Sequence, residues 1–178
     1  INNTAGDINC VDGVTSLWKS EWDGTKWTSA ELASAIGAVD SLSVAGEGSL
    51  AIYFSKDTDG NIDTIDDKEI FKYYNGKIDQ LTINDVADTK PKYINDKLIY
   101  YNDGEIIVEN DAAEFSINTD RFQYLAGDNG VDAIVYLEAG DNFTTLIYAV
   151  FNDGVGWGKP IVVSEIDGYV TGYSAVML

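Results

Sequence analysis

The sequence predicts an all-β protein, a β-propeller-like array of about four four-stranded blades, with a β-sandwich as the alternative. Three observations favour this fold class. Apolar runs are short, rich in Ile, Val, Tyr and Phe, and end at Asp, Asn or Gly, which is typical of strands joined by tight turns. Seventeen glycines stand against two prolines, as expected where many hairpin turns need a positive φ. Helical periodicity is almost absent.

One pattern occurs four times: an aromatic-rich run, a short polar turn and a second run. The turns lie at Gly24, Gly76, Asp111 and Gly154, so that 52, 35 and 43 residues separate them. A strand repeat that averages about 43 residues has the period of propeller blades. The expected strands on either side of the four turns are 17–22 and 26–30, 70–74 and 78–83, 105–108 and 114–117, and 146–151 and 159–163.

Two further strands are expected before each hairpin, which would make four strands in each unit. The expected strands of these two kinds are 41–45, 92–94, 122–126 and 173–178, followed in turn by 50–55, 97–101 and 133–138. Strand 173–178, at the C-terminal end of the chain, would complete the blade that begins near residues 8–11. Residues 1–178 would then form a single closed propeller. Alternatively they are a segment of a longer propeller, whose other blades come from a parent chain or another subunit.

Two of the hairpins share the sequence Asp-Gly-x-x-Trp, which ends at Trp27 and at Trp157. Asp-Gly favours a tight turn, and we expect each Trp to pack its hairpin onto a neighbour. These hairpins resemble the Asp-boxes of secreted bacterial propellers, whose motif is Ser-x-Asp-x-Gly-x-x-Trp. The copy from Ser20 to Trp27 lacks the residue between Asp and Gly. The resemblance implies an extracellular or cell-surface protein.

The segment 55–66 predicts a structural Ca²⁺ site. When it is compared with an EF-hand loop, oxygen donors fall at positions 1, 3, 5, 7, 9 and 12. These donors are Ser55, Asp57, Asp59, Asn61 (through its backbone carbonyl), Asp63 and Asp66. Calcium prefers several hard oxygen ligands at flexible distances. Gly60, at position 6, permits the sharp bend that brings such ligands together.

The segments that flank this loop read as strands rather than helices. In this setting the loop resembles the calcium loops of integrin α-subunit propellers, with the pattern Asp-x-Asp-x-Asp-Gly-x-x-Asp, although Ser55 replaces the first Asp. The resemblance implies that calcium is structural rather than catalytic. The alternative is a solvated acidic hairpin in an acidic protein.

The charge of the chain restricts its partners. Eleven basic residues stand against 30 acidic ones, which gives a net charge of −19. Nucleic acid and anionic membranes are therefore poor partners, since phosphate binding needs clustered Lys and Arg. No apolar run approaches the length of a membrane span, so membrane insertion is not expected. Cys10 has no second cysteine to pair with. Because the chain begins at Ile1, we expect it to come from a longer protein.

The residues needed for several kinds of catalysis are missing. The chain has no His, which excludes Ser-His-Asp and Cys-His nucleophiles and His-ligated zinc. Arg121 is the only arginine, whereas sialidases hold the substrate carboxylate with several. A glycoside-processing enzyme that uses paired carboxylates remains the alternative, but the sequence singles out no pair.

We therefore expect a non-catalytic extracellular binding module that recognises a glycan or a protein partner. Aromatic side chains that reach solvent would stack on sugars or anchor a protein. The candidates are Trp18, Trp22, Tyr74 and Tyr101. The alternative is that these side chains pack between blades.

Overall fold

The computed structural model describes residues 16–34, 36–37, 39–45, 50–58, 68–109, 115–117, 119–127 and 130–177. The chain divides into two compact units, Ile1–Tyr93 and Ile94–Leu178. In the described part, every regular element is a β-strand except one short 3₁₀ turn, η1 (Asp141–Phe143). No helix in that part is long and apolar enough to cross a membrane. The all-β prediction is confirmed.

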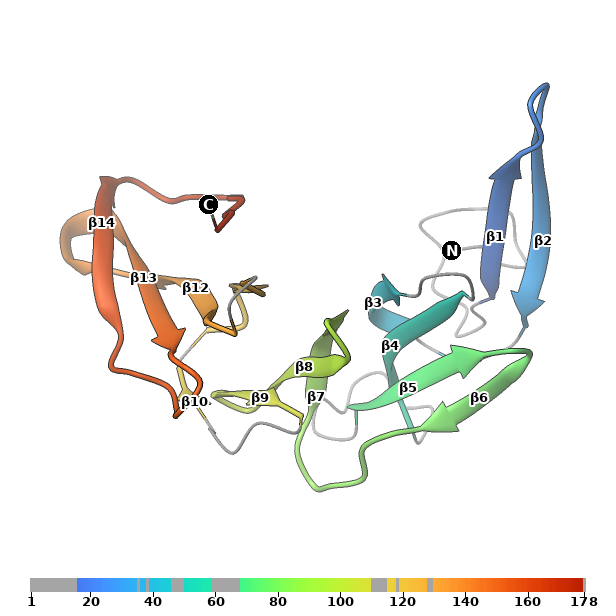
Figure 1. The fold of residues 1–178 in the computed structure, drawn as a ribbon, viewed down its shortest axis with the longest axis horizontal. Coiled ribbons are helices and arrows are strands. Elements are labelled where there is room, and N and C mark those ends of the chain that lie inside the picture. Colours follow the sequence, from blue (N-terminus) through green and yellow to red (C-terminus); the bar gives the residue numbers. More distant parts are fainter. Residues whose placement is uncertain are drawn as a thin grey trace. The chain divides into compact units, whose positions relative to one another are not determined.

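The first unit holds a two-stranded antiparallel ribbon and a four-stranded antiparallel sheet (Figure 1). The ribbon is β1 (Leu17–Trp22) and β2 (Trp27–Ala33). The sheet has its strands in chain order: β3 (Val39–Ala45), β4 (Ala51–Asp57), β5 (Lys68–Tyr74) and β6 (Lys77–Gln80). Consecutive strands pair in this order because runs that are neighbours in the chain meet with little loss of chain entropy.

The base of the ribbon is anchored to the core of the first unit. Its core cluster consists of Leu17, Ile36, Ile52, Phe54, Phe71 and Tyr73. Leu17 begins β1 and is buried, and the ladder shifts register between Leu17 and Trp18. Beyond this shift the residues of β1 are partly or fully exposed. One end of the ribbon is therefore held in the core while the rest reaches solvent.

Two more four-stranded sheets follow, again with their strands in chain order. One consists of β7 (Asp88–Ile94), β8 (Lys97–Asn102), β9 (Glu105–Val108) and β10 (Phe115–Ser116). The other consists of β11 (Phe122–Leu125), β12 (Asp132–Ala139), β13 (Thr144–Asn152) and β14 (Ile161–Asp167). The boundary between the two units falls near the end of β7.

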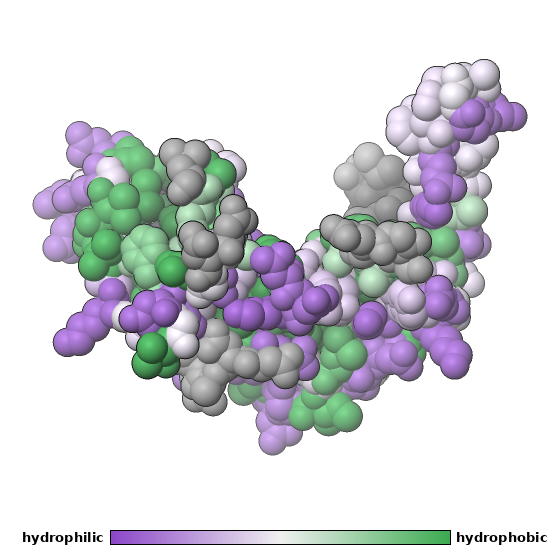
Figure 2. Space-filling model, viewed as in Figure 1, coloured by the Kyte–Doolittle hydropathy of each residue, from purple (hydrophilic) through white to green (hydrophobic). Residues whose placement is uncertain are grey.

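The core of the second unit is built from alternate residues of successive strands, as expected where one face of each sheet is buried. Its cluster consists of Ile99, Ile106, Val108, Ile117, Phe122, Tyr124, Ile134, Tyr136 and Val150. The edge strand β14 differs, because all seven of its residues are exposed and four of them are apolar. Hydrophobic residues accordingly gather over β13 and β14 in the space-filling view (Figure 2).

The strands of all four predicted hairpins pair as expected, as β1–β2, β5–β6, β9–β10 and β13–β14. The predicted turn at Asp111 lies outside the described residues. The predicted strand 173–178 is wrong, because residues 173–177 form no strand. The side chain of Gln123 accounts for this: its amide donates to Tyr173 O and accepts from Ala175 N, each at 2.8 Å. The Tyr173 hydroxyl adds bonds to Arg121 O and Val135 O, so the tail is held by side chains instead of a strand ladder. The expected strand 8–11 lies outside the described residues.

Candidate functional site

The β1–β2 ladder places three tryptophans on one side of the ribbon. Trp22 pairs with Trp27, Ser20 with Ser29, and Trp18 with Glu31. Directly paired residues of an antiparallel ladder share a face, and so do alternate residues of one strand. The six residues Trp18, Ser20, Trp22, Trp27, Ser29 and Glu31 therefore form one face, which we call the Trp face.

All six residues of the Trp face are exposed. The exposed fractions of Trp18, Trp22 and Trp27 are 45%, 55% and 69%. The centroids of the Trp22 and Trp27 ring systems lie 5.8 Å apart, with their planes at 58°. Between these rings and Trp18, the hydroxyl oxygens of Ser20 and Ser29 are hydrogen-bonded at 2.6 Å. The surface thus alternates indole rings with polar groups along the ribbon.

The tip of the ribbon is fixed by Asp23. Its Oδ1 accepts hydrogen bonds from the backbone N–H groups of Thr25 and Lys26 at 2.9 Å each, and from Thr25 Oγ1 at 2.8 Å. The bond from Lys26, with those from Thr25, lowers the pKa of Asp23. Gly24 has a φ of 101°, which a residue with a side chain would adopt only with strain. These contacts hold the Trp22–Trp27 pair at the end of β1 and the start of β2.

The structure separates the aromatic residues that the sequence grouped together. Trp18, Trp22 and Tyr74 are exposed, but Tyr101 is half-buried against the core of the second unit. Trp27, expected to pack its hairpin onto a neighbour, is the most exposed tryptophan instead. Trp27 opens β2 and pairs with Trp22 across the ladder, so its ring packs on that neighbour rather than on another sheet. Residues 27, 29 and 31 alternate along β2 and so share a face. This period of two in the sequence could have placed Trp27 on the Trp face.

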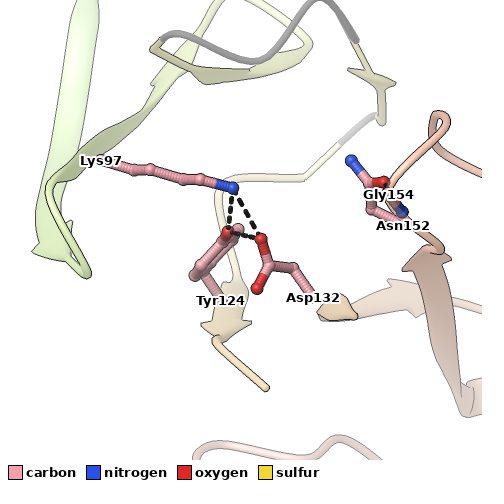
Figure 3. A network of polar contacts seen from close by, with 5 residues as sticks. All are labelled: Lys97, Tyr124, Asp132, Asn152 and Gly154. Carbon is pink, nitrogen blue, oxygen red and sulfur yellow. Dashed lines mark hydrogen bonds and ion pairs between the residues drawn. The ribbon is translucent and has the colours of Figure 1, made fainter. Parts of the chain in front are cut away.

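The expected packing role holds for Trp157. This residue is half-buried against the core of the second unit, and its ring meets that of Tyr124 edge-on, with 6.3 Å between centroids. It pairs with Asn152 in an isolated bridge. The side-chain oxygen of Asn152 accepts a hydrogen bond from Gly154 N at 2.8 Å, so this turn too is tied down by a side chain (Figure 3).

A polar network near Trp157 joins β8, β11 and β12 (Figure 3). Lys97 Nζ donates to Asp132 Oδ2 at 2.7 Å and to the Tyr124 hydroxyl at 3.3 Å, and that hydroxyl also donates to Asp132 Oδ2. The bond to Asp132 raises the pKa of Lys97 to about 12, and burial raises the pKa of Tyr124 to about 12.

Burial alone would raise the pKa of Asp132, but the hydrogen bonds from Lys97 and Tyr124 outweigh it and lower that pKa. Near neutral pH the network therefore holds a charged Lys97, a neutral Tyr124 and an ionised Asp132. None of the three has a pKa close to neutrality, where a general acid or base works best. The arrangement acts as a structural cross-link within the second unit.

A buried pair of carboxyl groups lies in the first unit, at Glu69 on β5 and Asp88 on β7. Their exposed fractions are 3% and 0%. Glu69 accepts hydrogen bonds from Thr82 Oγ1 at 2.5 Å and from Asn84 N at 2.7 Å, and the Asn84 side chain donates to Asp88 at 2.8 Å.

Burial raises the pKa of Glu69, against the hydrogen bonds from Thr82 and Asn84, and the neighbouring Asp88 carboxylate raises it further. Two glycosidase carboxyl groups must reach the sugar from either side of its glycosidic bond. Glu69 and Asp88 are shielded from solvent and joined through Asn84, so this pair does not have that arrangement.

The predicted calcium loop is described only at its start. Ser55 and Asp57 lie two residues apart on β4 and are both buried. Ser55 Oγ is 2.8 Å from Ser41 Oγ, and Asp57 lies opposite Lys68 in the ladder. Asp59, Asn61, Asp63 and Asp66 lie outside the described residues. Within the described ranges, no group of three or more Asp, Glu, His or Cys residues could hold a metal ion.

Comparison with protein-family models, with curated proteins and with solved structures gave no significant match to this chain.

Proposed function

We propose that the chain is a non-catalytic extracellular binding module that recognises a neutral glycan through the Trp face. One observation supports this most: three exposed indoles share one face with two serine hydroxyls and a carboxylate. Indole rings pack against the apolar C–H faces of sugars, while nearby polar groups bind the hydroxyls. The alternation of rings and polar groups matches a ligand whose own surface alternates in the same way.

The charge of the protein favours a neutral ligand over an anionic one. The net charge is −19, and Glu31 adds a carboxylate to the Trp face itself. A sulfated or sialylated glycan would meet repulsion from this field, and so would a nucleic acid. A protein partner is the alternative ligand. It would use the same tryptophans as anchors, since Trp is enriched among the residues that dominate protein interfaces.

A glycan array followed by titration calorimetry tests the proposal. We expect signals on neutral glycans and none on sulfated or sialylated ones. Trp22→Ala and Trp27→Ala should each weaken binding by about tenfold or more, because each removes a stacked ring. Glu21→Gln is the matched control, because Glu21 lies on the opposite face of β1, in an ion pair with Lys19. Binding to a protein in the absence of any glycan signal would overturn the neutral-glycan assignment.

We also propose that the sheets are propeller blades, either of a single propeller or of a segment of a longer one. The support is their topology: three sheets of four antiparallel strands, each in chain order, as blades require. The exposed apolar residues of β14 fit an array in which a further blade, from a parent chain or another subunit, covers that strand. Small-angle scattering tests the arrangement: a profile that fits a two-layer sandwich and not a ring or arc of blades would refute it.

A structural Ca²⁺ ion bound by the 55–66 loop completes the proposal. Its support is the spacing of the oxygen donors, together with the position of Ser55 and Asp57 on one face of β4. Lys68, opposite Asp57, would compete with the cation for that carboxylate. Calcium at a hundred times its Kd would stabilise the fold by about 2.7 kcal/mol. Thermal unfolding with calcium and with a chelator measures this, and equal midpoints would refute the site.

A further inference from the structure

We infer that the ligand of the Trp face is a linear oligosaccharide of several sugar rings, bound along the ribbon, rather than a single terminal sugar. This inference rests on the proposed function and adds the size of the ligand. It follows from the spacing, the openness and the unequal ends of the Trp face.

The spacing of the rings is set by the strand itself. Trp18 and Trp22 are four residues apart on β1 without a register shift between them. A strand rises about 3.3 Å per residue, so their Cα atoms lie about 13 Å apart. This distance exceeds the width of one pyranose ring. A ligand that touches both tryptophans must therefore extend over more than one sugar.

The middle of the Trp face is polar. Ser20 and Ser29 lie halfway between Trp18 and the Trp22–Trp27 pair, and their oxygens are 2.6 Å apart. When one hydroxyl donates to the other, one hydroxyl hydrogen and several lone pairs remain for a ligand. A sugar that lies between the stacked rings would bind there through its own hydroxyls. The face thus offers three consecutive subsites: aromatic, polar and aromatic.

The Trp face is open, because all six of its residues are exposed and they belong to a ribbon of only two strands. An open face contacts a ligand from one side only. A single sugar would bury little of its surface there, unlike a small ligand enclosed in a pocket. Useful affinity must therefore come from contacts summed along the ribbon.

The two ends of the Trp face are unequal. Near the tip, Trp22 and Trp27 present two rings inclined at 58°, which can contact one sugar from two directions. At the other end, Trp18 is the only ring and lies opposite Glu31. The tip should bind the first sugar, and Trp18 should contribute only when the ligand is long enough to reach it.

A length series tests this directly. The probes are mono- to hexasaccharides of glucose, mannose, galactose and xylose on one array, with dissociation constants measured for the series that bind. We expect affinity to rise at least about tenfold between the monosaccharide and the tetrasaccharide as the second aromatic subsite is occupied. Trp18→Ala should remove this gain but leave short ligands unaffected, whereas Trp22→Ala should weaken every length.

Trp18→Phe keeps an aromatic ring and should retain part of the gain, and Thr28→Ala, on the opposite face, should retain all of it. Far-UV circular dichroism checks that each variant is folded. Equal affinity for mono- and hexasaccharides would overturn the linear ligand and leave glycan binding intact. The absence of binding to every neutral saccharide would overturn the proposed function and this inference with it.

Discussion

Removing the carboxylate of Asp132 should destabilise the second unit more than the loss of a surface charge would. Asp132→Asn leaves a charged Lys97 Nζ beside a neutral amide and gives the Tyr124 hydroxyl a weaker acceptor. Only 10% of the Asp132 side chain and 30% of the Lys97 side chain are exposed. Loss of one partner in a largely buried, hydrogen-bonded pair should therefore cost about 2–3 kcal/mol of unfolding free energy.

The coupling between the two charges is smaller than this total. The pKa of Lys97 rises from 10.5 to about 12, chiefly through the hydrogen bond to Asp132 and against burial. At about 1.36 kcal/mol per pH unit, this net shift corresponds to about 2 kcal/mol. Because Lys97 is partly exposed, solvent screening should reduce the coupling to about 1–1.5 kcal/mol. A double-mutant cycle of Asp132→Asn with Lys97→Met isolates this quantity.

The stability that the network contributes should fall at both acidic and alkaline pH. The lowered pKa of Asp132 contributes stability above its unfolded value of 3.8, and this is lost as the pH falls through the folded pKa. The raised pKa values of Lys97 and Tyr124 contribute stability below 10.5 and 10.0, which is lost as the pH rises through about 12. The contribution of the network should thus be greatest between about pH 4 and 10.

Urea unfolding at pH 3, 7 and 10.5 provides the assay. Near-UV circular dichroism follows the loss of aromatic packing in both units, to which the Trp157–Tyr124 contact of the second unit contributes. Asp167→Asn removes one exposed negative charge from β14 and is the matched control, expected to change stability by less than about 0.5 kcal/mol. A coupling energy indistinguishable from zero, or Asp132→Asn and wild-type curves that stay parallel from pH 3 to 7, would refute the cross-link.

Two other substitutions probe the fold. Glu69→Gln mimics the protonated acid. The wild-type protein should lose stability as the pH rises above 4.5 through the raised folded pKa of Glu69. The variant should lack this loss, and urea denaturation at several pH values measures the difference. Identical pH profiles would contradict a raised pKa. Gly127→Ala should cost about 2–4 kcal/mol, because its new Cβ would lie 2.1 Å from Val131 O and 2.9 Å from Met177 Sδ. Gly172→Ala meets nothing within 4 Å, and equal thermal midpoints for the two alanine variants would contradict the crowding.

The sequence predicted local pairing well because the hairpins depend on short-range chemistry. Asp-Gly and Asn-Gly turns next to apolar runs give β1–β2, β5–β6 and β13–β14, since a tight turn fixes which residues of its two strands meet. The strand prediction for 173–177 failed because the apolar pattern of this tail resembles a strand, whereas the side chains of Gln123 and Tyr173 supply its hydrogen bonds. A long-range side-chain contact leaves no periodic trace in the sequence.

The candidate site was only partly predictable for a related reason. The sequence names Trp18 and Trp22 as candidates for exposure, with packing between blades as the alternative, and it assigns Trp27 to the scaffold together with Trp157. The two tryptophans end the same Asp-Gly-x-x-Trp motif, and each pairs with the residue five positions earlier. Burial depends on the sheet beside the hairpin, and the motif does not encode that sheet.

The two hairpins differ in the residue that pairs with the motif tryptophan. Opposite Trp157 stands Asn152, which is buried and accepts a hydrogen bond from the turn at Gly154, while the indole of Trp157 packs against the core. The equivalent position opposite Trp27 is Trp22, whose indole has no oxygen to accept that bond. In both turns the motif Asp accepts the backbone N–H two residues later, Asp23 from Thr25 and Asp153 from Val155. The same motif therefore stabilises the scaffold in β13–β14 and presents a pair of exposed rings in β1–β2. The two hairpins thus share the motif and the pairing, and they differ in the residue opposite the tryptophan and in the exposure of the rings.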